Sequence, residues 1–237
     1  MQLILSGIER RDNVLKRLQK HCKGVLTREW DGKSIPVVVG NLHGADKIQV
    51  TCREQNIPYI LIDHGYFHRS SDLEWARFCV NNYHCTDWRS SIRDIPEAKD
   101  YRSGEHVVIL PPADKVSYIY NASRWLDATI EEIRKHTKRK VIIKRKGEGD
   151  FNKALEKAHV IVSFGSVADV EASLYGVPVI VSDHSPAKPI SNSIKDIENL
   201  NYPDRHDWLR SLAAAEWHMS EMDKCWDRLK GQLDGIN

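Results

Sequence analysis

Short, wholly apolar runs alternate with longer amphipathic segments along this chain of 237 residues, and this alternation constrains the fold most strongly. Continuous apolar strands separated by helices are typical of a parallel sheet that is covered on both faces. In the first half, the pattern predicts strands at 2–6, 35–40 and 59–63 and helices at 12–21 and 43–55. In the second half, it predicts strands at 106–110, 140–144, 160–163 and 178–182 and helices at 123–136, 150–158 and 167–175. The chain is therefore predicted to be an α/β protein.

The two βα series are separated by a stretch in which the pattern weakens. Residues 70–102 carry aromatic side chains among polar ones, and we expect mostly loop or irregular helix there. A seam at 101–105 divides the chain into domains at 1–103 and 104–237, and the tail at 207–233 is predicted to be helical throughout. We expect two Rossmann-like parallel-sheet domains that face a central cleft, with a binding site at the carboxyl ends of both sheets.

Composition and charge exclude some classes of protein. With 41% hydrophobic and 29% charged residues, the chain has the composition of an ordinary soluble globular protein. A net charge of +2 neither requires nor excludes nucleic acid as a partner. No apolar run has the length of a membrane span, and the amino terminus lacks the pattern of a signal peptide. An odd number of cysteines without a CxxC pair favours a reducing compartment, so we expect a cytoplasmic protein.

The segment at 160–183 is the most informative one for chemistry. A predicted strand runs into Phe164, Gly165 and Ser166, and a helix begins at about Val167. Glycine lets a backbone approach closely, serine is a good N-cap, and the amides at a helix start suit a diphosphate. Gly176 is expected to end the helix as a C-cap. A plain strand–turn–helix that needs glycine and serine for geometry alone is the alternative interpretation.

This segment resembles the donor-binding region of GT-B glycosyltransferases, in which a Gly/Ser turn precedes a helix that bears a glutamate. The matching residues are Gly165, Ser166, Glu171, Gly176, Pro178, Val179 and Ile180. The resemblance implies that the helix start, from Gly165 to Val167, binds the donor diphosphate and that Glu171 holds the ribose hydroxyls. A solvated helix residue is the alternative for Glu171.

A broader similarity covers nearly the whole chain. The stretches at 59–69, 106–114, 141–146 and 216–226 resemble a group of phage-associated GT-B-like proteins. The resemblance implies a metal-independent glycosyltransferase that uses a nucleotide sugar as cosubstrate and needs no other cofactor. The phage association adds the host cytoplasm as the location and a hydroxymethylated pyrimidine in DNA as one acceptor. A surface polysaccharide or a small molecule is the alternative acceptor.

Basic residues follow one of the predicted strands of the second half. Lys144, Arg145 and Lys146 leave the carboxyl end of the strand at 140–144, where they would neutralise a donor diphosphate. A solvated basic run is the alternative interpretation. Pro112, in the turn after the strand at 106–110, is expected to flank the sugar or the phosphates.

In the first half, Asp63 and His64 end the third predicted strand. A carboxylate beside an imidazole is a reasonable general-base pair for an acceptor hydroxyl, although both could serve a turn instead. On the acceptor side we also place His43, Gly65, Tyr66 and Arg69. Aromatic residues at 70–88, together with Arg69, Arg77 and Arg89, are candidates for contact with a flipped base.

No metal site is predicted. Cys79, His84 and Cys85 lie close in sequence, but no second ligand pair follows, so buried thiols are the better interpretation. GxGxxG and P-loop motifs are absent from the sequence, which argues against a dinucleotide oxidoreductase or an NTPase. A non-catalytic nucleotide-binding module and a different α/β enzyme acting on nucleotide sugars are the competing functions. Oligomeric state and sugar identity have no signal in the sequence.

Overall fold

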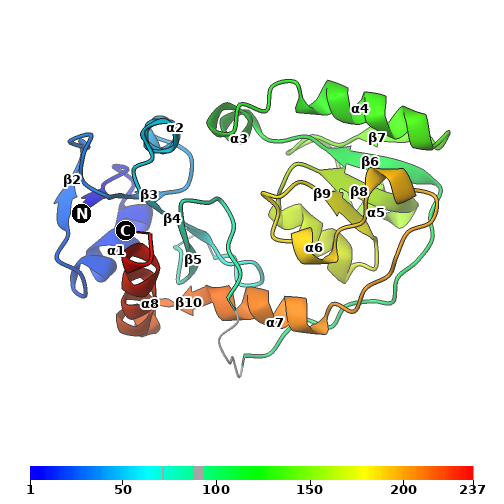
Figure 1. The fold of residues 1–237 in the computed structure, drawn as a ribbon. Helices are drawn as coiled ribbons and strands as arrows, with labels where there is room; N and C mark the ends of the chain where they lie inside the picture. Colours follow the sequence, from blue (N-terminus) through cyan, green and yellow to red (C-terminus); the bar gives the residue numbers. More distant parts are fainter. Residues whose placement is uncertain (71, 88–92, 237) are drawn as a thin grey trace. The chain divides into compact units, whose positions relative to one another are not determined.

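The computed structural model describes residues 1–70, 72–87 and 93–236 of the chain (Figure 1). The chain forms two compact units. The first contains Met1–Arg93, Tyr118–Tyr120 and Ser211–Asn237, and the second contains Asp94–Ser117 and Asn121–Arg210. The α/β organisation predicted from the sequence is confirmed, but the sheet of the first unit is not wholly parallel, as was predicted, because two of its strand pairs are antiparallel. Residues 104–237 were predicted to form one domain, whereas in the structure Ser211–Asn237 belong to the first unit.

A six-stranded sheet forms the centre of the first unit, with the strand order β10-β5-β4-β3-β1-β2. Its strands are β1 (Gln2–Ile4), β2 (Val25–Thr27), β3 (Pro36–Val39), β4 (Ile60–His64), β5 (Trp75–Val80) and β10 (Glu216–His218). The pairs among β1 to β4 are parallel. Both β4–β5 and β5–β10 pair antiparallel, so the sheet is mixed.

Helices cover both faces of this sheet. Successive side chains of a strand point to opposite faces, and all four residues of β3 are buried, so each face needs a cover. Val37 and Val39 of β3 pack in a cluster with α1 (Glu9–Gln19) and α8 (Met222–Asp234). Val38, between them, packs on the opposite face with α2 (Ala45–Gln55). Figure 1 shows α8, in red, beside α1, in blue, so the two ends of the chain meet in one core.

One prediction for the first unit is incomplete and one is wrong. Residues 70–102 were expected to be mostly loop or irregular helix, and those that the structure describes are, except for β5, whose buried Arg77 interrupts the apolar run. The tail was expected to be one helix, but α7 (His206–Ala215) ends where β10 begins, followed by the short η3 (Met219–Glu221). Pairing with β5 overrides the helical pattern of the tail, because it satisfies the edge of the sheet.

The second unit contains a parallel sheet of four strands in the order β7-β6-β8-β9. The strands are β6 (His106–Leu110), β7 (Val141–Ile143), β8 (Ala158–Ser163) and β9 (Val179–Val181). The other elements are α3 (Asp114–Ile119), α4 (Trp125–His136), α5 (Phe151–Glu156), α6 (Val167–Leu174), η1 (Lys188–Ile190) and η2 (Ile194–Asp196). All four predicted strands of this half are confirmed to within a few residues. The short helix α3 was not predicted.

Opposite faces of this sheet carry different helices. Ile133 of α4 packs with Val107, Ile109 and Val162 on one face, and α6 contacts β8 and β9 from the other (Figure 1). This is the arrangement that right-handed crossovers produce when successive strands are added on opposite sides of a starting strand.

Candidate functional site

The order of the strands in the second unit creates a candidate binding site. From β6, the chain proceeds to β7 on one side, and then returns to form β8 and β9 on the other side of β6. The loops after β6 and β8 are therefore neighbours that lead to helices on opposite faces. In open α/β sheets, ligands bind in the crevice at such a switch point, outside the carboxyl ends of the strands.

The loop after β8 ends at a well-formed helix start. Ser166 is extended, with φ −153° and ψ 155°, and its Oγ accepts a hydrogen bond from the Ala168 amide at 3.2 Å. The Ser166 amide donates in turn to Asp169 Oδ2 at 3.0 Å, which completes a capping box. The predicted N-cap is therefore confirmed. Ser166 and Val167 stand at the amino terminus of α6, where the helix dipole favours an anion.

Gly165 holds this loop against the loop after β9. Its φ is +154°, and an added Cβ would lie 3.1 Å from the carbonyl carbon and oxygen of His184. The Ser182 hydroxyl also donates to the Phe164 carbonyl oxygen, and the rings of Phe164 and His184 lie 5.2 Å apart. The backbone around α6 is thus fixed by contacts across β8 and β9.

Asp169 lies beneath this site and was not singled out by the sequence. It is fully buried and accepts hydrogen bonds from Ser163 Oγ at 2.5 Å and Ser185 Oγ at 2.6 Å. Burial raises the pKa of Asp169 to about 6, although the hydrogen bonds from Ser163, Ser185 and Ser166 act in the opposite direction. The Ser-x-x-Asp spacing of a capping box is the signal that would have found it.

Glu171 is exposed on α6, one turn beyond Val167. Pro112, half-buried, follows β6 at the neighbouring strand end. The structure therefore brings Pro112, Gly165, Ser166 and Val167 to the same edge of the sheet, and Glu171 lies one helical turn beyond that edge.

The predicted basic residues lie farther from the helix start. Lys144, Arg145 and Lys146 follow β7, which is an edge strand separated from β8 by β6. Neighbouring strands are about 4.8 Å apart, so these residues leave the sheet at roughly 10 Å from the end of β8. Arg145 and Lys146 are exposed, and Lys144 Nζ donates to the Arg145 carbonyl at 3.2 Å. Long basic side chains can span part of this distance.

In the first unit, Asp63 and His64 are held by the protein itself. One oxygen of Asp63 accepts from the His64 amide at 2.8 Å, and the other pairs with buried Arg77 at 2.8 Å. Arg77 also donates to the His64 carbonyl. Burial holds the pKa of His64 below its usual range, with Asp63 acting in the opposite direction. These contacts favour a structural role for Asp63.

The four acceptor-side candidates do not form one surface. Gly65 is packed against the His68 carbonyl and Glu216, so protein fills the space beside its backbone. Tyr66 is buried, and its hydroxyl donates to the Cys85 carbonyl at 2.6 Å. His43 and Arg69 are exposed.

The predicted contact of Arg77 with DNA is wrong, because the side chain is 1% exposed and paired with Asp63. Trp88 and Arg89, which belong to the same prediction, lie outside the described residues.

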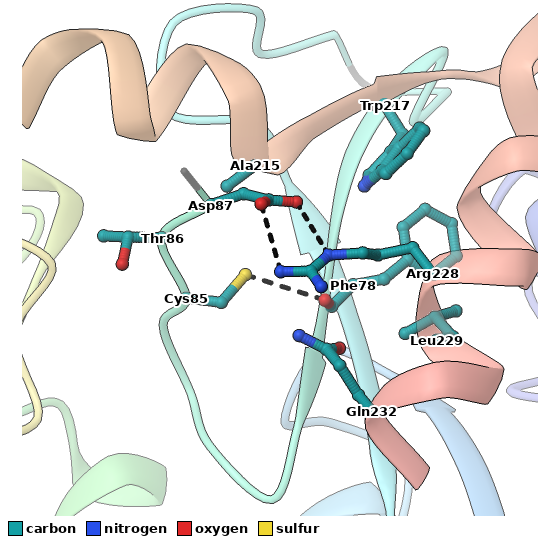
Figure 2. Close-up of a pocket in the computed structure, with 9 residues that line it drawn as sticks. All are labelled: Phe78, Cys85, Thr86, Asp87, Ala215, Trp217, Arg228, Leu229 and Gln232. Carbon is teal, nitrogen blue, oxygen red and sulfur yellow. Dashed lines mark hydrogen bonds and ion pairs between the residues drawn. The ribbon is translucent and has the colours of Figure 1, made fainter. Parts of the chain in front are cut away.

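A small cavity lies between β5, β10 and α8 in the first unit (Figure 2). It is spanned by Arg228, whose Nε and Nη2 donate to the two Asp87 oxygens at 3.0 Å each. Its volume is about 10 Å³, which is room for about one water molecule. This cavity is too small for a substrate.

Cys85 lines this cavity, and its sulfur lies 2.9 Å from that of Cys79; both are free thiols. Across the described residues, no group of three or more His, Cys, Asp or Glu side chains is arranged to hold a metal ion. Within the same residues, the helices are too short or too polar to cross a membrane.

Comparison with solved structures shows that the fold is similar to that of a known protein. KpsC of Thermosulfurimonas dismutans, described as a β-Kdo 2,7 transferase, matches with a TM-score of 0.55 at 11% identity over 94% of this chain and 98% of that one. The chain has a glycosyltransferase-like fold. A second structure from that protein, described as a β-Kdo 2,4 transferase, matches with a TM-score of 0.44 at 9% identity over 90% of this chain and 89% of that one. That second match is too weak to support an argument.

No protein-family model matches the sequence. The search of curated proteins also found no match.

Proposed function

We propose that the protein is a nucleotide-sugar-dependent glycosyltransferase whose donor binds at the carboxyl edge of the sheet in the second unit. The observation that carries this proposal is the start of α6 at the switch point between β6 and β8. The glycosyltransferase-like fold supports the reaction class. The GT-B type, with the donor on the second unit and the acceptor on the first, is part of the proposal.

In this proposal, each group at the edge has one task. The amino terminus of α6, from Gly165 to Val167, binds the phosphate of the donor through the helix dipole and through backbone amides other than that of Ser166, which donates to Asp169. Glu171 accepts hydrogen bonds from the ribose hydroxyls, and Pro112 flanks the donor. Lys144, Arg145 and Lys146 balance the negative charge that develops on the leaving nucleotide. Because helix amides and cations do this work, we propose that transfer is metal-independent.

Donor binding is tested by calorimetry with a panel of nucleotides, comparing wild type with Glu171→Ala. A lost hydrogen bond to a charged group is worth about 1.5–3 kcal/mol, so affinity should fall roughly tenfold or more. Glu131→Ala is the matched control, because Glu131 is an exposed carboxylate on α4 of the same unit. Equal affinity of wild type and Glu171→Ala would contradict the assigned role of Glu171.

Transfer is tested with a panel of nucleotide sugars that includes activated Kdo. The acceptors are a hydroxymethylpyrimidine-containing DNA, a surface glycan and small alcohols, followed by mass, with and without a chelator. We propose that the acceptor is a hydroxyl group, with the DNA base and the glycan as competing arms of the assay. Nucleotide binding without transfer or donor hydrolysis would instead identify a binding module.

A further inference from the structure

A row of charged side chains crosses three neighbouring strands of the first unit. In the register of the sheet, Asp63 of β4 lies opposite Arg77 of β5, and Arg77 lies opposite Glu216 of β10. Residues opposite one another project from the same face of a sheet. Arg77 is 1% exposed and Glu216 is fully buried. One cation therefore lies between two carboxylates, and Asp63 Oδ2 already pairs with it at 2.8 Å.

The loop after β4 wraps around the second carboxylate. Glu216 Oε2 lies 2.7 Å from His68 Nδ1, and Oε1 accepts from the Phe67 amide. Gly65 makes this wrapping possible, because an added Cβ would lie 2.8 Å from the Glu216 carboxyl carbon and 2.7 Å from the His68 carbonyl oxygen. The loop is thus shaped to place His68 on Glu216.

His68 is the exposed member of this pair. Its side chain is 47% exposed, against 1% for Glu216, and its ring stacks on Trp75 with centroids 4.4 Å apart. Since an ionised carboxylate can only accept, Nδ1 must carry the hydrogen. The lone pair then lies on Nε2, for which no protein partner lies within hydrogen-bond distance in the described part of the chain. The contact with Glu216 therefore sets both the ring orientation and the tautomer, and about half of the His68 side chain is open to solvent.

We propose that His68, oriented by Glu216, is the general base that deprotonates the acceptor hydroxyl. This inference rests on the proposed glycosyltransferase function. His68 Nε2 takes the proton as the acceptor oxygen bonds to the anomeric carbon of the sugar. The bond from that carbon to the phosphate oxygen of the donor breaks, and its electron pair leaves with the nucleotide. The charge of the resulting imidazolium is balanced by Glu216 at Nδ1. Glu216 acts as a positioning residue.

This assignment differs from the pair that the sequence suggested. Both oxygens of Asp63 are occupied, by the His64 amide and by Arg77. His68 lies five residues after Asp63, in the loop that follows β4, and combines a half-exposed ring with a buried carboxylate partner. The partner comes from the tail, 148 positions away in sequence, which is why local spacing did not reveal it.

Nitrogen-15 NMR of the ring tests the geometry without any substrate. In wild type, Nε2 of His68 should be the unprotonated nitrogen at alkaline pH. Glu216→Gln should reverse the tautomer, because the amide that replaces the carboxylate donates to Nδ1 and leaves the hydrogen on Nε2. A wild-type ring with its hydrogen on Nε2 would overturn the assignment.

Transfer kinetics test the role of the base. His68→Ala and His68→Gln should lower kcat by about 10²–10⁴-fold with little change in donor KM, since a positioned general base contributes that much. Exogenous imidazole should restore part of the activity of His68→Ala but not that of His68→Gln, where no space is vacated. A merely structural histidine would not give this pattern of rescue.

His218→Ala is the matched control. His218 also contacts Trp75, but its Nδ1 bonds Ser220 Oγ and its Nε2 bonds Glu74, so neither nitrogen is free to act. Its transfer rate should stay within about twofold of wild type. If the wild type is active and folded His68→Ala is fully active as well, the role assigned to His68 is wrong, while the proposed function still stands. An inactive wild type that fails to bind nucleotides would overturn the proposed function and the role of His68 with it.

Discussion

At the scale of single residues, Asp169 shows how a carboxylate can organise a site without facing it. Its oxygens bind two serine hydroxyls and the Ser166 amide, which ties the ends of β8 and β9 to the start of α6. A buried carboxylate is costly in its charged form, and the hydrogen bonds offset only part of this cost. Asp169 should therefore couple the stability of the second unit to pH.

The sign of this coupling follows from the pKa. The carboxyl group has an ordinary pKa of 3.8, and burial raises it to about 6 in the folded protein. Between these values the folded state holds a proton that the unfolded state has lost, so stability falls as the pH rises from about 4 to 6. A shift of this size corresponds to about 3 kcal/mol. The difference in the free energy of unfolding between wild type and Asp169→Asn should change by up to that amount across this pH range, as measured by urea denaturation. If the free energies of unfolding of the two proteins change with pH in parallel, Asp169 does not couple stability to pH.

Arg77 marks the limit of what single residues disclose in a sequence. Asp63 and His64 were noticed because they end a predicted strand, and the structure confirms that place. Their partner Arg77 lies 14 positions beyond Asp63, in a stretch without clear periodicity. An arginine there is indistinguishable from a surface residue until β5 is known to pair with β4. Burial of a charge depends on partners that are distant in sequence, so its role could not be predicted.

At the scale of elements, the end of α6 depends on Gly176. Its φ is +85°, which favours glycine, and an added Cβ would overlap the Asp100 carbonyl oxygen. The amide of Arg102 also donates to the Gly176 carbonyl oxygen at 3.0 Å. The segment at 99–102 thus packs directly on the glycine that follows the C-cap residue of α6, Tyr175.

Gly176→Ala should therefore destabilise the second unit by at least about 2 kcal/mol, because backbone strain and a backbone clash add together. Gly147→Ala is the control, since Gly147 has a φ of +84° in the same unit with nothing within 4 Å of an added Cβ. That variant should cost only about 1 kcal/mol. Denaturant midpoints of both variants measure the difference, and equal losses would show that the Asp100 contact does not matter.

Elements were predicted best where local signals agree with the final packing. For α6, a Gly-Ser turn, an apolar face and a C-terminal glycine all predict the same helix. Its bounds differ by one residue from the prediction. The tail gave a helical pattern across 207–233, yet Glu216–His218 form a strand. Glu216 fits that strand because the loop at 65–68 and its His68 surround it. Such a partnership has no local signature.

At the scale of the whole molecule, the chain returns to the unit in which it began. The final segment, Ser211–Asn237, supplies β10 to the edge of the first sheet and α8 to its core. Met222, Cys225, Leu229 and Leu233 of α8 are buried in the cluster that contains Val14, Leu15 and Leu18 of α1. Complete burial of one such large side chain contributes about 1.5–3 kcal/mol. Several of them together equal a large part of the stability of a small domain.

A chain that ends at Arg210 should therefore keep its second unit folded and lose its first. The sheet of the second unit contains strands from residues 106–181 alone, whereas the first would lose β10 and α8. Limited proteolysis followed by mass spectrometry should show rapid cleavage within residues 1–93 and protection of a fragment that spans 94–210. A chain that ends at Asp234 keeps all of α8 and serves as the control, with wild-type protection throughout. If residues 1–93 resist the protease equally in both truncated chains, the first unit does not depend on the tail, and the contacts of α8 with α1 contribute little to its stability.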